Sequence, residues 1–434
     1  MHSERCVRPG LYLLQVIFWF IAAVLSQAAA NDLRHPEAPL VQPSQTAAHL
    51  SGYRLLRQTL FRYLWIRDRG GWPQLPPQGP VLKMGDVGDE VSRIRRQLKV
   101  VGDLSEDTPE SEMFDSDMER AVRHFQYRHG LEQDGIVGRK TRAALAVPVE
   151  QRILQLTINL ERWRGLPRDL GGRYIMVNSA AFLLQAHAGD RVPLEMRVIV
   201  GRKNLQTPTF SESMRYLIVN PYWHVPNKIA RVDLIPALLR DPGYFSSHHI
   251  RVLSSWREDA MELDPLSVRW SEYLSRRAIP FQLRQDPGPH NALGRIKFML
   301  PNRYSVYLHD TPSKQLFKHT VRTFSHGCVR VEKPLELANY VLGGGVDGRT
   351  PSALESIIQQ GKTRTILLPR PVPVYVVYMT AWVDPRGKVH FQRDIYQRDQ
   401  RLAARMRPDA PASAPGAGVI KASFASTETG EISR

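Results

Sequence analysis

The first part of the chain predicts helices, because its apolar residues recur at every third or fourth position. A polar segment rich in Ala, Pro and Gln, 31–52, is typical of a linker, and the apolar spacing over 53–67 predicts a helix after it. Three short helices with glycine-rich joints are predicted within 80–147, and a longer helix over 150–164. We therefore expect 31–79 to form a linker and a helical scaffold, followed by a small three-helix bundle.

Beyond these helices the pattern changes to short, mostly apolar runs separated by turns, which predicts strands. The runs cover 174–178, 182–185, 196–200, 216–220, 296–300, 305–308, 365–368 and 372–377. The predicted fold class is α+β and multidomain, in which the helical bundle precedes a mainly β, sandwich-like domain over 148–401.

A helix-like, aromatic-rich insertion interrupts the predicted strands at about 233–285. An insertion of this length in a β domain serves either as a lid over a site or as structural support, and the sequence leaves both roles open. Residues 402–434 are rich in Ala, Ser, Pro and Gly, which predicts a disordered tail.

The first thirty residues have the three parts of an export signal. Arg5 and Arg8 form a basic start, 11–25 is almost entirely apolar, and 28–30 supplies small residues for cleavage. The alternative is a retained membrane anchor, because 11–30 is just long enough to span a bilayer. Either way, the rest of the chain is expected outside the cytoplasm.

Composition and charge narrow the classes of partner. With 42% hydrophobic and 23% charged residues, the chain is not mostly disordered or collagen-like. Its net charge of +17 favours an anionic partner. For an exported protein this partner is a phospholipid surface or the carboxylate-rich cell wall and not nucleic acid. The alternative is that the charge only maintains solubility.

Cys328 is the single cysteine of the exported part, since Cys6 lies in the export signal. A lone cysteine forms no disulfide within its chain and is often a small buried hydrophobic residue. Its neighbours favour chemistry instead, because Gly327 permits a sharp bend next to the thiol. His309 follows a strand-like run, and a histidine within hydrogen-bond reach can take the thiol proton.

This arrangement resembles the catalytic motif of the L,D-transpeptidases, which is a His, a spacer and then Ser/Thr-His-Gly-Cys. Fifteen residues separate His309 from Ser325, the first residue of the Ser-His-Gly-Cys motif that ends at Cys328. The resemblance continues through 220–226, 287–288, 291, 293–294 and 297–298, and so covers about 153–400. It departs from many family members at Arg330, where they have Asn, and we interpret Arg330 as a substrate or loop contact.

Residues 80–147 resemble the peptidoglycan-binding domain found on many cell-wall enzymes. The matching positions are Gly85, Asp86, Val87, Gly88, Val91, Leu98, Ala121, Val122, Phe125, Gln126, Gly130, Leu131, Asp134, Gly135, Gly138 and Thr141. This resemblance implies binding of glycan strands or stem peptides, or a spacer that has lost such binding. With the insertion, it places the chain near the large, multidomain periplasmic subgroup of the family.

The resemblance implies a site in which Cys328 is the nucleophile and His309 is the proton donor and acceptor. Backbone N–H groups around Gly327 are expected to stabilise an oxyanion. Further candidates for oxyanion or substrate contacts are Ser325, His326, Arg330, Tyr307 and Trp223. No cofactor and no metal are expected, because His248 and His249 lack the additional ligands of a metal site.

The implied reaction is that of a periplasmic peptidoglycan L,D-transpeptidase that forms 3→3 cross-links. A tetrapeptide stem acylates the cysteine as a thioester with release of D-alanine, and the diaminopimelate amine of a second stem resolves it. Other cell-wall synthases are candidate partners, inner-membrane anchoring stays open, and carbapenems are expected to acylate the sulfur. The alternatives are an L,D-carboxypeptidase or endopeptidase that uses water, transfer to a lipoprotein lysine, and an inactive wall-binding structural protein.

Overall fold

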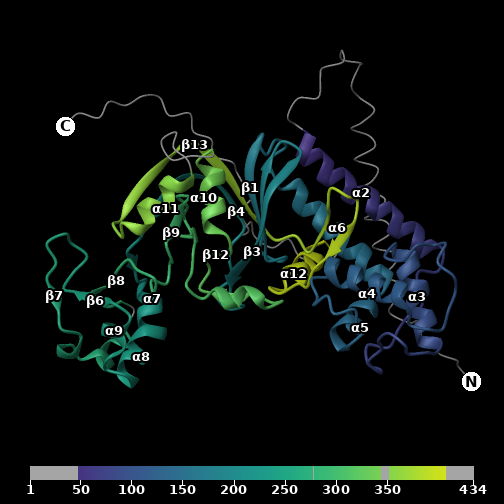
Figure 1. Ribbon diagram of the computed structural model, residues 1–434, viewed down its shortest axis with the longest axis horizontal. Coiled ribbons are helices and arrows are strands. Elements are labelled where there is room, and N and C mark those ends of the chain that lie inside the picture. The colour runs from purple at the N-terminus through teal and green to yellow at the C-terminus, as the bar shows by residue number, and fades with distance from the viewer. Residues whose placement is uncertain (1–46, 277, 344–350, 407–434) are drawn as a thin grey trace, which may run out of the picture.

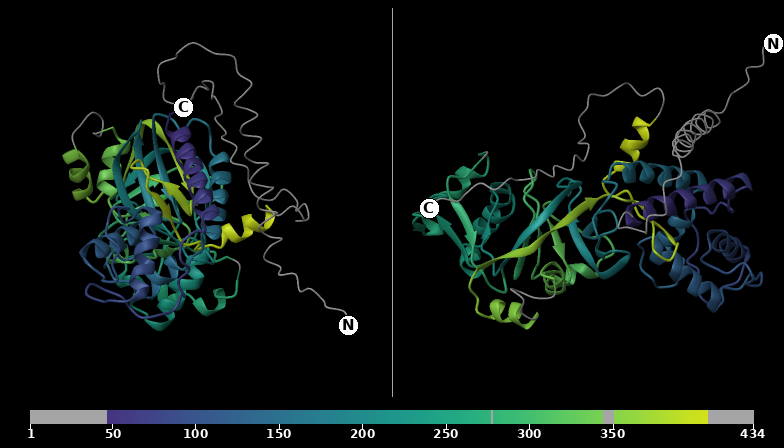
Figure 2. Two further views of the ribbon diagram at one scale, coloured as in Figure 1. Left: turned by 90° about the vertical axis from the view of Figure 1, so that its right-hand side faces the viewer. Right: turned by 90° about the horizontal axis from the view of Figure 1, so that it is seen from above.

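The computed structural model describes residues 47–276, 278–343 and 351–406. The predicted export signal or membrane anchor at 1–30 and most of the predicted linker and tail lie outside these residues. The described chain is elongated, with helices at one end, a β-sheet in the middle and the insertion at the other end (Figure 1). The view from above in Figure 2 shows the same order. Among the described residues, no helix is long and apolar enough to cross a membrane.

Two long helices connect the small helical unit to the sheet. α2 spans Ala47–Asp68 and α6 spans Val149–Arg164, and their apolar side chains share one core cluster. α2 ends before Gly70 and Gly71, whose φ angles of 94° and 73° suit glycine and not a continuing helix. The helix predicted over 53–67 is therefore present, but it begins within the segment predicted as a linker.

The small helical unit consists of α3 (Asp89–Val101), α4 (Ser116–Arg128) and α5 (Arg139–Leu145). These are the three short helices expected from the sequence. Asp115 caps α4, because its carboxylate accepts a hydrogen bond from the N–H of Met118 at 2.9 Å. The apolar faces of the three helices meet in a core cluster of their own.

The central sheet closes on itself. Its strands are β1 (Arg173–Asn178), β2 (Leu183–Ala188), β3 (Arg191–Gly201), β4 (Phe210–Val219), β9 (Ile296–Met299), β10 (Leu308–His309), β11 (Thr323–Ser325), β12 (Val329–Val331) and β13 (Arg364–Val377), with the short helix η4 (Lys314–Lys318) between β10 and β11. Their order is β11-β3-β12-β10-β9-β4-β13-β1-β2, and β2 also pairs with β3. The prediction of a mainly β, sandwich-like domain is confirmed, and the β2–β3 pairing makes the sheet barrel-like.

The strands and two helices share one apolar core. Val177 of β1, Val219 of β4 and Phe298 of β9 are fully buried in it. α10 (Pro334–Val341) and α11 (Pro351–Gln359) lie against the sheet and add side chains to the same cluster (Figure 1). This core holds the strand ends, on which the site is built, in fixed register.

Two of the predicted strands are one strand. The runs 365–368 and 372–377 both belong to β13, whose pairing with β4 shifts register between Leu367 and Val372. Pro369 and Pro371 lie in this interval, and proline lacks the N–H that a continuous ladder needs. The interruption in the sequence pattern therefore marks an irregularity within a strand and not its end.

The insertion is a mixed α and β unit. Its elements are β5 (Trp223–His224), α7 (Asn227–Ile229), η1 (Ala230–Leu234), α8 (Ile235–Arg240), α9 (Tyr244–Ser247), β6 (Ile250–Leu253), β7 (Glu262–Leu263), η2 (Pro265–Ser267), η3 (Trp270–Tyr273) and β8 (Gln282–Gln285). Short helices were expected here, whereas the four-stranded sheet in the order β5-β8-β6-β7 was not. Its strands are too short for an alternating pattern to stand out from the sequence.

The described chain ends with a hairpin and a helix. β14 (Ala381–Val383) pairs with β15 (Val389–Phe391), and α12 spans Arg398–Arg405. The Asp394 carboxylate accepts hydrogen bonds from the N–H groups of the first two residues of α12, at 2.8 and 2.9 Å. These bonds stabilise the start of α12, so residues 402–405 are helical and do not belong to a disordered tail.

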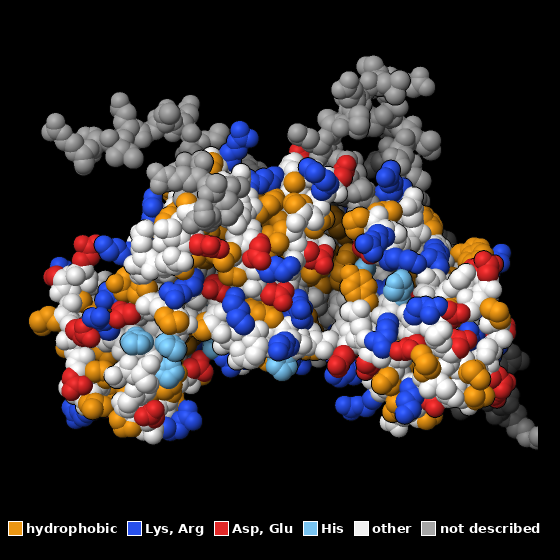
Figure 3. Space-filling model, in the orientation of Figure 1, with side chains coloured by type: hydrophobic (Ala, Val, Ile, Leu, Met, Phe, Trp, Pro, Cys, Tyr) orange, Lys and Arg blue, Asp and Glu red, His pale blue; other side chains and the backbone are white. Residues whose placement is uncertain are grey.

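The basic side chains do not gather in one place on the face that Figure 3 presents. Lys and Arg side chains alternate there with Asp and Glu over the helices, the sheet and the insertion. On this face the net positive charge is therefore spread, as expected of a surface that stays soluble, and forms no single stripe.

Candidate active site

Cys328 directly precedes strand β12, next to strand β10. These strands run parallel, with Leu308 opposite Val329 and His309 opposite Arg330. Leu308 and Val329 are fully buried in the core. Because successive side chains of a strand point to opposite faces, His309, Arg330 and Cys328 lie on the other face. The fold thus brings the two predicted catalytic residues onto one face of neighbouring strands.

The thiol of Cys328 is half-buried, and its Sγ lies 3.9 Å from the carbonyl oxygen of Ser305. Burial raises the pKa of this thiol. Hydrogen bonds from the backbone N–H and the hydroxyl of Tyr307 lower it, as do the positive charges of Lys297 and Arg330. The pKa stays above its usual value, so the resting sulfur at neutral pH is mainly a thiol.

Two cations flank the sulfur. Lys297 of β9 lies opposite His309 in the strand register, and its ammonium is 4.1 Å from the centroid of the Tyr307 ring. Burial lowers the pKa of both Lys297 and Arg330, and the charge of Cys328 raises it in each case. Arg330 Nε is buried and has no hydrogen-bond partner among the described residues. Both cations therefore stabilise the thiolate once it forms.

Sequence reasoning did not select Lys297 as a site residue, although it lies in a matching segment of the family resemblance. A lysine in a strand is usually part of a solvated face. Its role depends on the pairing of β9 with β10, which places it opposite His309. Strand register of this kind is set by the three-dimensional fold and is not visible in the local pattern.

His309 is buried, and its hydrogen bond indicates which ring nitrogen carries the hydrogen when the imidazole is neutral. Its Nδ1 lies 2.6 Å from the carbonyl oxygen of Asp310, so Nδ1–H donates and Nε2 is left as an acceptor. Burial and the charges of Arg330 and Lys297 lower the pKa of His309 to about 3, against the opposing effect of the Asp310 bond. Among the described contacts, no hydrogen bond joins the imidazole to Cys328. The resting pair is therefore a thiol and a neutral imidazole.

The loop that carries Cys328 is held by its own hydrogen bonds. Gly327 has a φ of 122°, in the region that favours glycine. The Ser325 hydroxyl donates to the Cys328 carbonyl at 2.5 Å and accepts from the Gly327 N–H at 3.1 Å. The Gly327 N–H is thus occupied, whereas no hydrogen bond from the Cys328 N–H occurs within the described part of the chain. Of the two N–H groups that were expected to bind an oxyanion, only that of Cys328 is therefore available.

His326 joins the cysteine loop to the insertion. Its Nε2 lies 2.7 Å from the Asp233 carboxylate on η1, and Arg202 contacts the same ring. Burial and Arg202 lower the pKa of His326, and Asp233 opposes this shift. His326 therefore has a structural partner in the insertion, which brings the insertion into direct contact with the residue two positions before Cys328.

The two predicted aromatic residues differ in position. Tyr307 adjoins the sulfur, and its ring centroid is 5.6 Å from that of His309. Trp223 pairs with Gln285 and packs against the apolar core of the insertion. None of its described contacts reaches Cys328, so the structure brings Tyr307 but not Trp223 into the cluster.

Two other features lie apart from this cluster. A cavity of about 890 Å³ between α2 and strands β1 and β2 is lined by none of the residues around Cys328. Among the residues that the structure describes, no group of three or more His, Cys, Asp or Glu side chains could hold a metal ion. His248 instead stacks on Tyr244, with ring centroids 4.1 Å apart.

Comparison with known proteins shows what the part of the chain around the cluster is similar to. Residues 172–375, which contain Lys297, His309 and Cys328, match the family model of the L,D-transpeptidase catalytic domain. This part of the chain is therefore similar to the catalytic domain of the L,D-transpeptidases. Residues 87–145, which contain the three helices of the small unit, match the model described as "Putative peptidoglycan binding domain". The resemblances seen in the sequence are therefore confirmed for both parts.

A curated relative of this chain comes from Haemophilus influenzae and is named "Putative L,D-transpeptidase". It is 34% identical over 254 residues, which is 58% of this chain and 50% of the relative. The matched part thus spans half of the length of that relative.

Two solved structures are also similar. The L,D-transpeptidase of Xylanimonas cellulosilytica (its residues 123–326) is 16% identical, with a TM-score of 0.21, over 70% of this chain and all of that one. The L,D-transpeptidase of Stackebrandtia nassauensis is 11% identical, with a TM-score of 0.26, over 68% of this chain and 94% of that one.

Proposed function

We propose that the chain is an exported peptidoglycan L,D-transpeptidase that forms 3→3 cross-links through a thioester on Cys328. One observation carries the proposal: the half-buried thiol lies beside two cations, on the same strand face as a neutral, buried His309. A neutral imidazole can accept a proton, and the cations stabilise the thiolate that results.

In the first half-reaction, His309 Nε2 takes the thiol proton. The sulfur attacks the carbonyl between the third residue of a tetrapeptide stem and its terminal D-alanine. The Cys328 N–H, which lacks another partner among the described residues, donates to the oxyanion. Protonated His309 then gives its proton to the leaving amine, which departs as D-alanine and leaves a thioester.

In the second half-reaction, the side-chain amine of diaminopimelate in a second stem attacks the thioester. His309 accepts a proton from this amine and passes it to the departing sulfur, which leaves as the thiol. Water competes with the amine, so a site that excludes water favours transfer. The contact between Asp233 of the insertion and His326 supports the insertion as the lid that does so.

The test is mass spectrometry of the products that the purified exported region forms from a disaccharide-tetrapeptide. The proposal predicts 3→3 dimers and free D-alanine, and neither from Cys328→Ala protein. His309→Ala should retain the fold and slow thioester formation strongly. Release of D-alanine without dimers, even with added amine acceptor, would instead identify a carboxypeptidase. Dimers formed by the Cys328→Ala protein would refute the proposal.

A further inference from the structure

The cysteine loop is held from behind by a threonine outside the catalytic motif. Thr207 follows β3 and is completely buried. Its hydroxyl donates to the Gly327 carbonyl at 2.8 Å and accepts from the Gly201 N–H at 2.9 Å. One side chain thus connects the end of β3 to the residue before the nucleophile.

The segment around Thr207 is itself clamped by the C-terminal part of the described chain. The Tyr396 hydroxyl donates to the Gly201 carbonyl at 2.6 Å and lies 3.5 Å from the Thr207 N–H. Arg398 donates to the Thr207 carbonyl at 2.8 Å. The segment before Thr207 also packs closely on Gly201. A Cβ at Gly201 would lie only 2.0 Å from the carbonyl oxygen of Leu205, so the position requires glycine.

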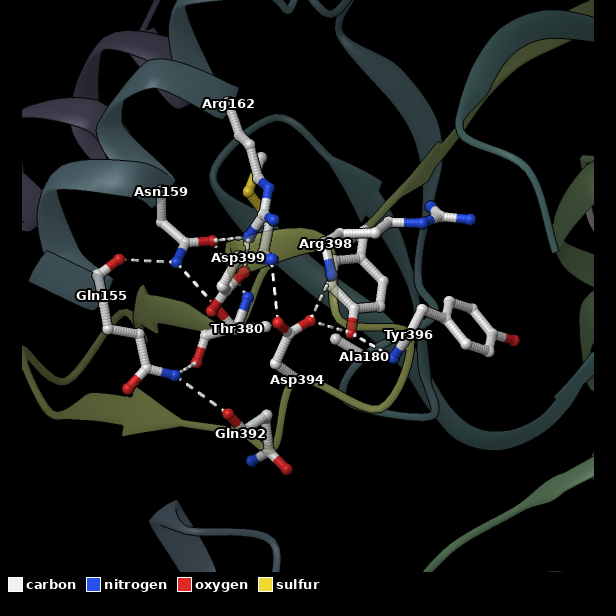
Figure 4. A network of polar contacts seen from close by, with 12 residues as sticks. Gln155, Asn159, Arg162, Ala180, Thr380, Gln392, Asp394, Tyr396, Arg398 and Asp399 are labelled. Atoms are coloured by element: carbon white, nitrogen blue, oxygen red, sulfur yellow. Dashed lines mark hydrogen bonds and ion pairs between the residues drawn. The ribbon is translucent and has the colours of Figure 1, made fainter. Parts of the chain in front are cut away.

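A polar network anchors Tyr396 and Arg398 to the scaffold helix α6 (Figure 4). The Tyr378 hydroxyl donates to Asp394 at 2.7 Å and accepts from the Tyr396 N–H at 2.9 Å. The Asp399 carboxylate pairs with Arg162 of α6 at 2.6 Å. Tyr396 and Arg398 lie beyond residue 375, where the match to the catalytic family model ends.

The Gly327 carbonyl and the Cys328 N–H belong to the same peptide group, which is planar and normally trans. They therefore point in opposite directions, and a bond that fixes one fixes the direction of the other. The Thr207 hydroxyl fixes the carbonyl, while the N–H on the opposite side has no partner among the described residues.

We propose that Thr207 is a positioning residue: through the Gly327 carbonyl it aims the Cys328 N–H at the oxyanion, and Tyr396 holds Thr207 in place. This rests on the proposed role of Cys328 as the acylated nucleophile. The consequence is selective. Loss of the Thr207 hydroxyl weakens reactions of Cys328 that pass through a tetrahedral oxyanion, and spares reactions that do not.

Two reagents separate these classes without any cell-wall substrate. p-Nitrophenyl acetate acylates a thiolate through a tetrahedral oxyanion with loss of p-nitrophenolate, whereas iodoacetamide alkylates it by displacement of iodide with no oxyanion. For Thr207→Val we expect acylation of Cys328 to slow about tenfold or more, and alkylation to change less than about twofold. Thr207→Ser keeps the hydroxyl and should restore acylation. Rates on Cys328→Ala protein give the background.

Tyr396→Phe is the second variant, in case Thr207→Val does not fold as judged by circular dichroism. It should lower the acylation-to-alkylation ratio in the same direction, whereas Tyr127→Phe, at an exposed tyrosine, should leave the ratio unchanged. An unchanged ratio in a folded Thr207→Val or Tyr396→Phe protein overturns the inference, as does a loss that Thr207→Ser fails to rescue. If wild-type protein releases no D-alanine from a tetrapeptide, the proposed function fails, while the reagent ratio still decides the role of Thr207.

Discussion

At the scale of residues, the reactivity of Cys328 results from opposing effects. Burial raises the thiol pKa, whereas Tyr307 and the charges of Lys297 and Arg330 lower it. The same burial and the same cations keep His309 neutral. The pair is therefore uncharged at rest, and the cations act on the thiolate as it forms.

Replacement of Lys297 tests this electrostatic account. Lys297→Met keeps an unbranched side chain over the Tyr307 ring but removes the positive charge. Because a nearby cation favours the thiolate, its loss should raise the thiol pKa by about one unit. The midpoint of the pH dependence of iodoacetamide alkylation measures this shift. Lys318→Met, at an exposed lysine, is the control, and equal midpoints in wild type and Lys297→Met would contradict the account.

The pH dependence of acylation tests the state of His309. Its pKa is lowered to about 3, so the imidazole gains a proton only as the pH falls toward that value. The rate of D-alanine release should therefore stay level as the pH falls through 6.5, the usual pKa of histidine. If the rate falls as the proton concentration rises just below pH 6.5, and His309→Gln abolishes that fall, then His309 is not held neutral.

At the scale of elements, the site depends on where strands end and on what covers them. β10 carries His309, β12 begins directly after Cys328, and the pairing of β9 with β10 adds Lys297 opposite His309. η1 of the insertion reaches the cysteine loop through the contact of Asp233 with His326. The sheet thus holds the side chains around Cys328 in place. Under the proposed function, the insertion controls access to them.

Asp233→Asn tests the insertion as a lid. A partly exposed polar contact of this kind contributes up to about 1 kcal/mol, so its loss shifts a closed–open equilibrium up to about fivefold toward the open state. We expect the ratio of hydrolysis to cross-linking, measured by mass spectrometry of the products, to rise accordingly. Asp259→Asn, an exposed carboxylate of the same insertion, should not change the ratio. An equal ratio in wild type and Asp233→Asn would favour a purely structural insertion.

At the scale of the whole molecule, a buried arginine joins the small helical unit to the rest. Arg128 of α4 pairs with Asp103, and both side chains are almost inaccessible. Arg128 also donates to the Val389 carbonyl of β15 at 3.0 Å. The unit that matches the peptidoglycan-binding model is therefore attached to the catalytic part by specific contacts.

Breaking this pair should be costly, because it leaves a buried charge without a partner. We expect Arg128→Met to lower the free energy of unfolding by about 3 kcal/mol. Adding Asp103→Leu removes the orphaned carboxylate and should recover much of the loss. Denaturant unfolding of the two variants measures both effects. No loss in Arg128→Met would show that the pair does not stabilise the folded chain.

Much of this architecture was predictable from local patterns. The spacing of apolar residues predicted the helices α3 to α6 and most of the strands, and the motif from His309 to Cys328 predicted the family. What local patterns could not show depends on partners distant in sequence. Lys297 gains its role from strand pairing, and Thr207 gains its role from a hydrogen bond to Gly327, 120 residues away.

The most direct test of the central claim is to trap the acyl group itself. Wild-type protein is quenched in acid during turnover of a tetrapeptide donor, digested, and analysed by peptide mass spectrometry. We predict a tripeptide acyl group on the peptide that contains Cys328, removed by hydroxylamine as expected of a thioester. An acyl group on any other residue, or turnover without an adduct that persists in the Cys328→Ala protein, would contradict the account.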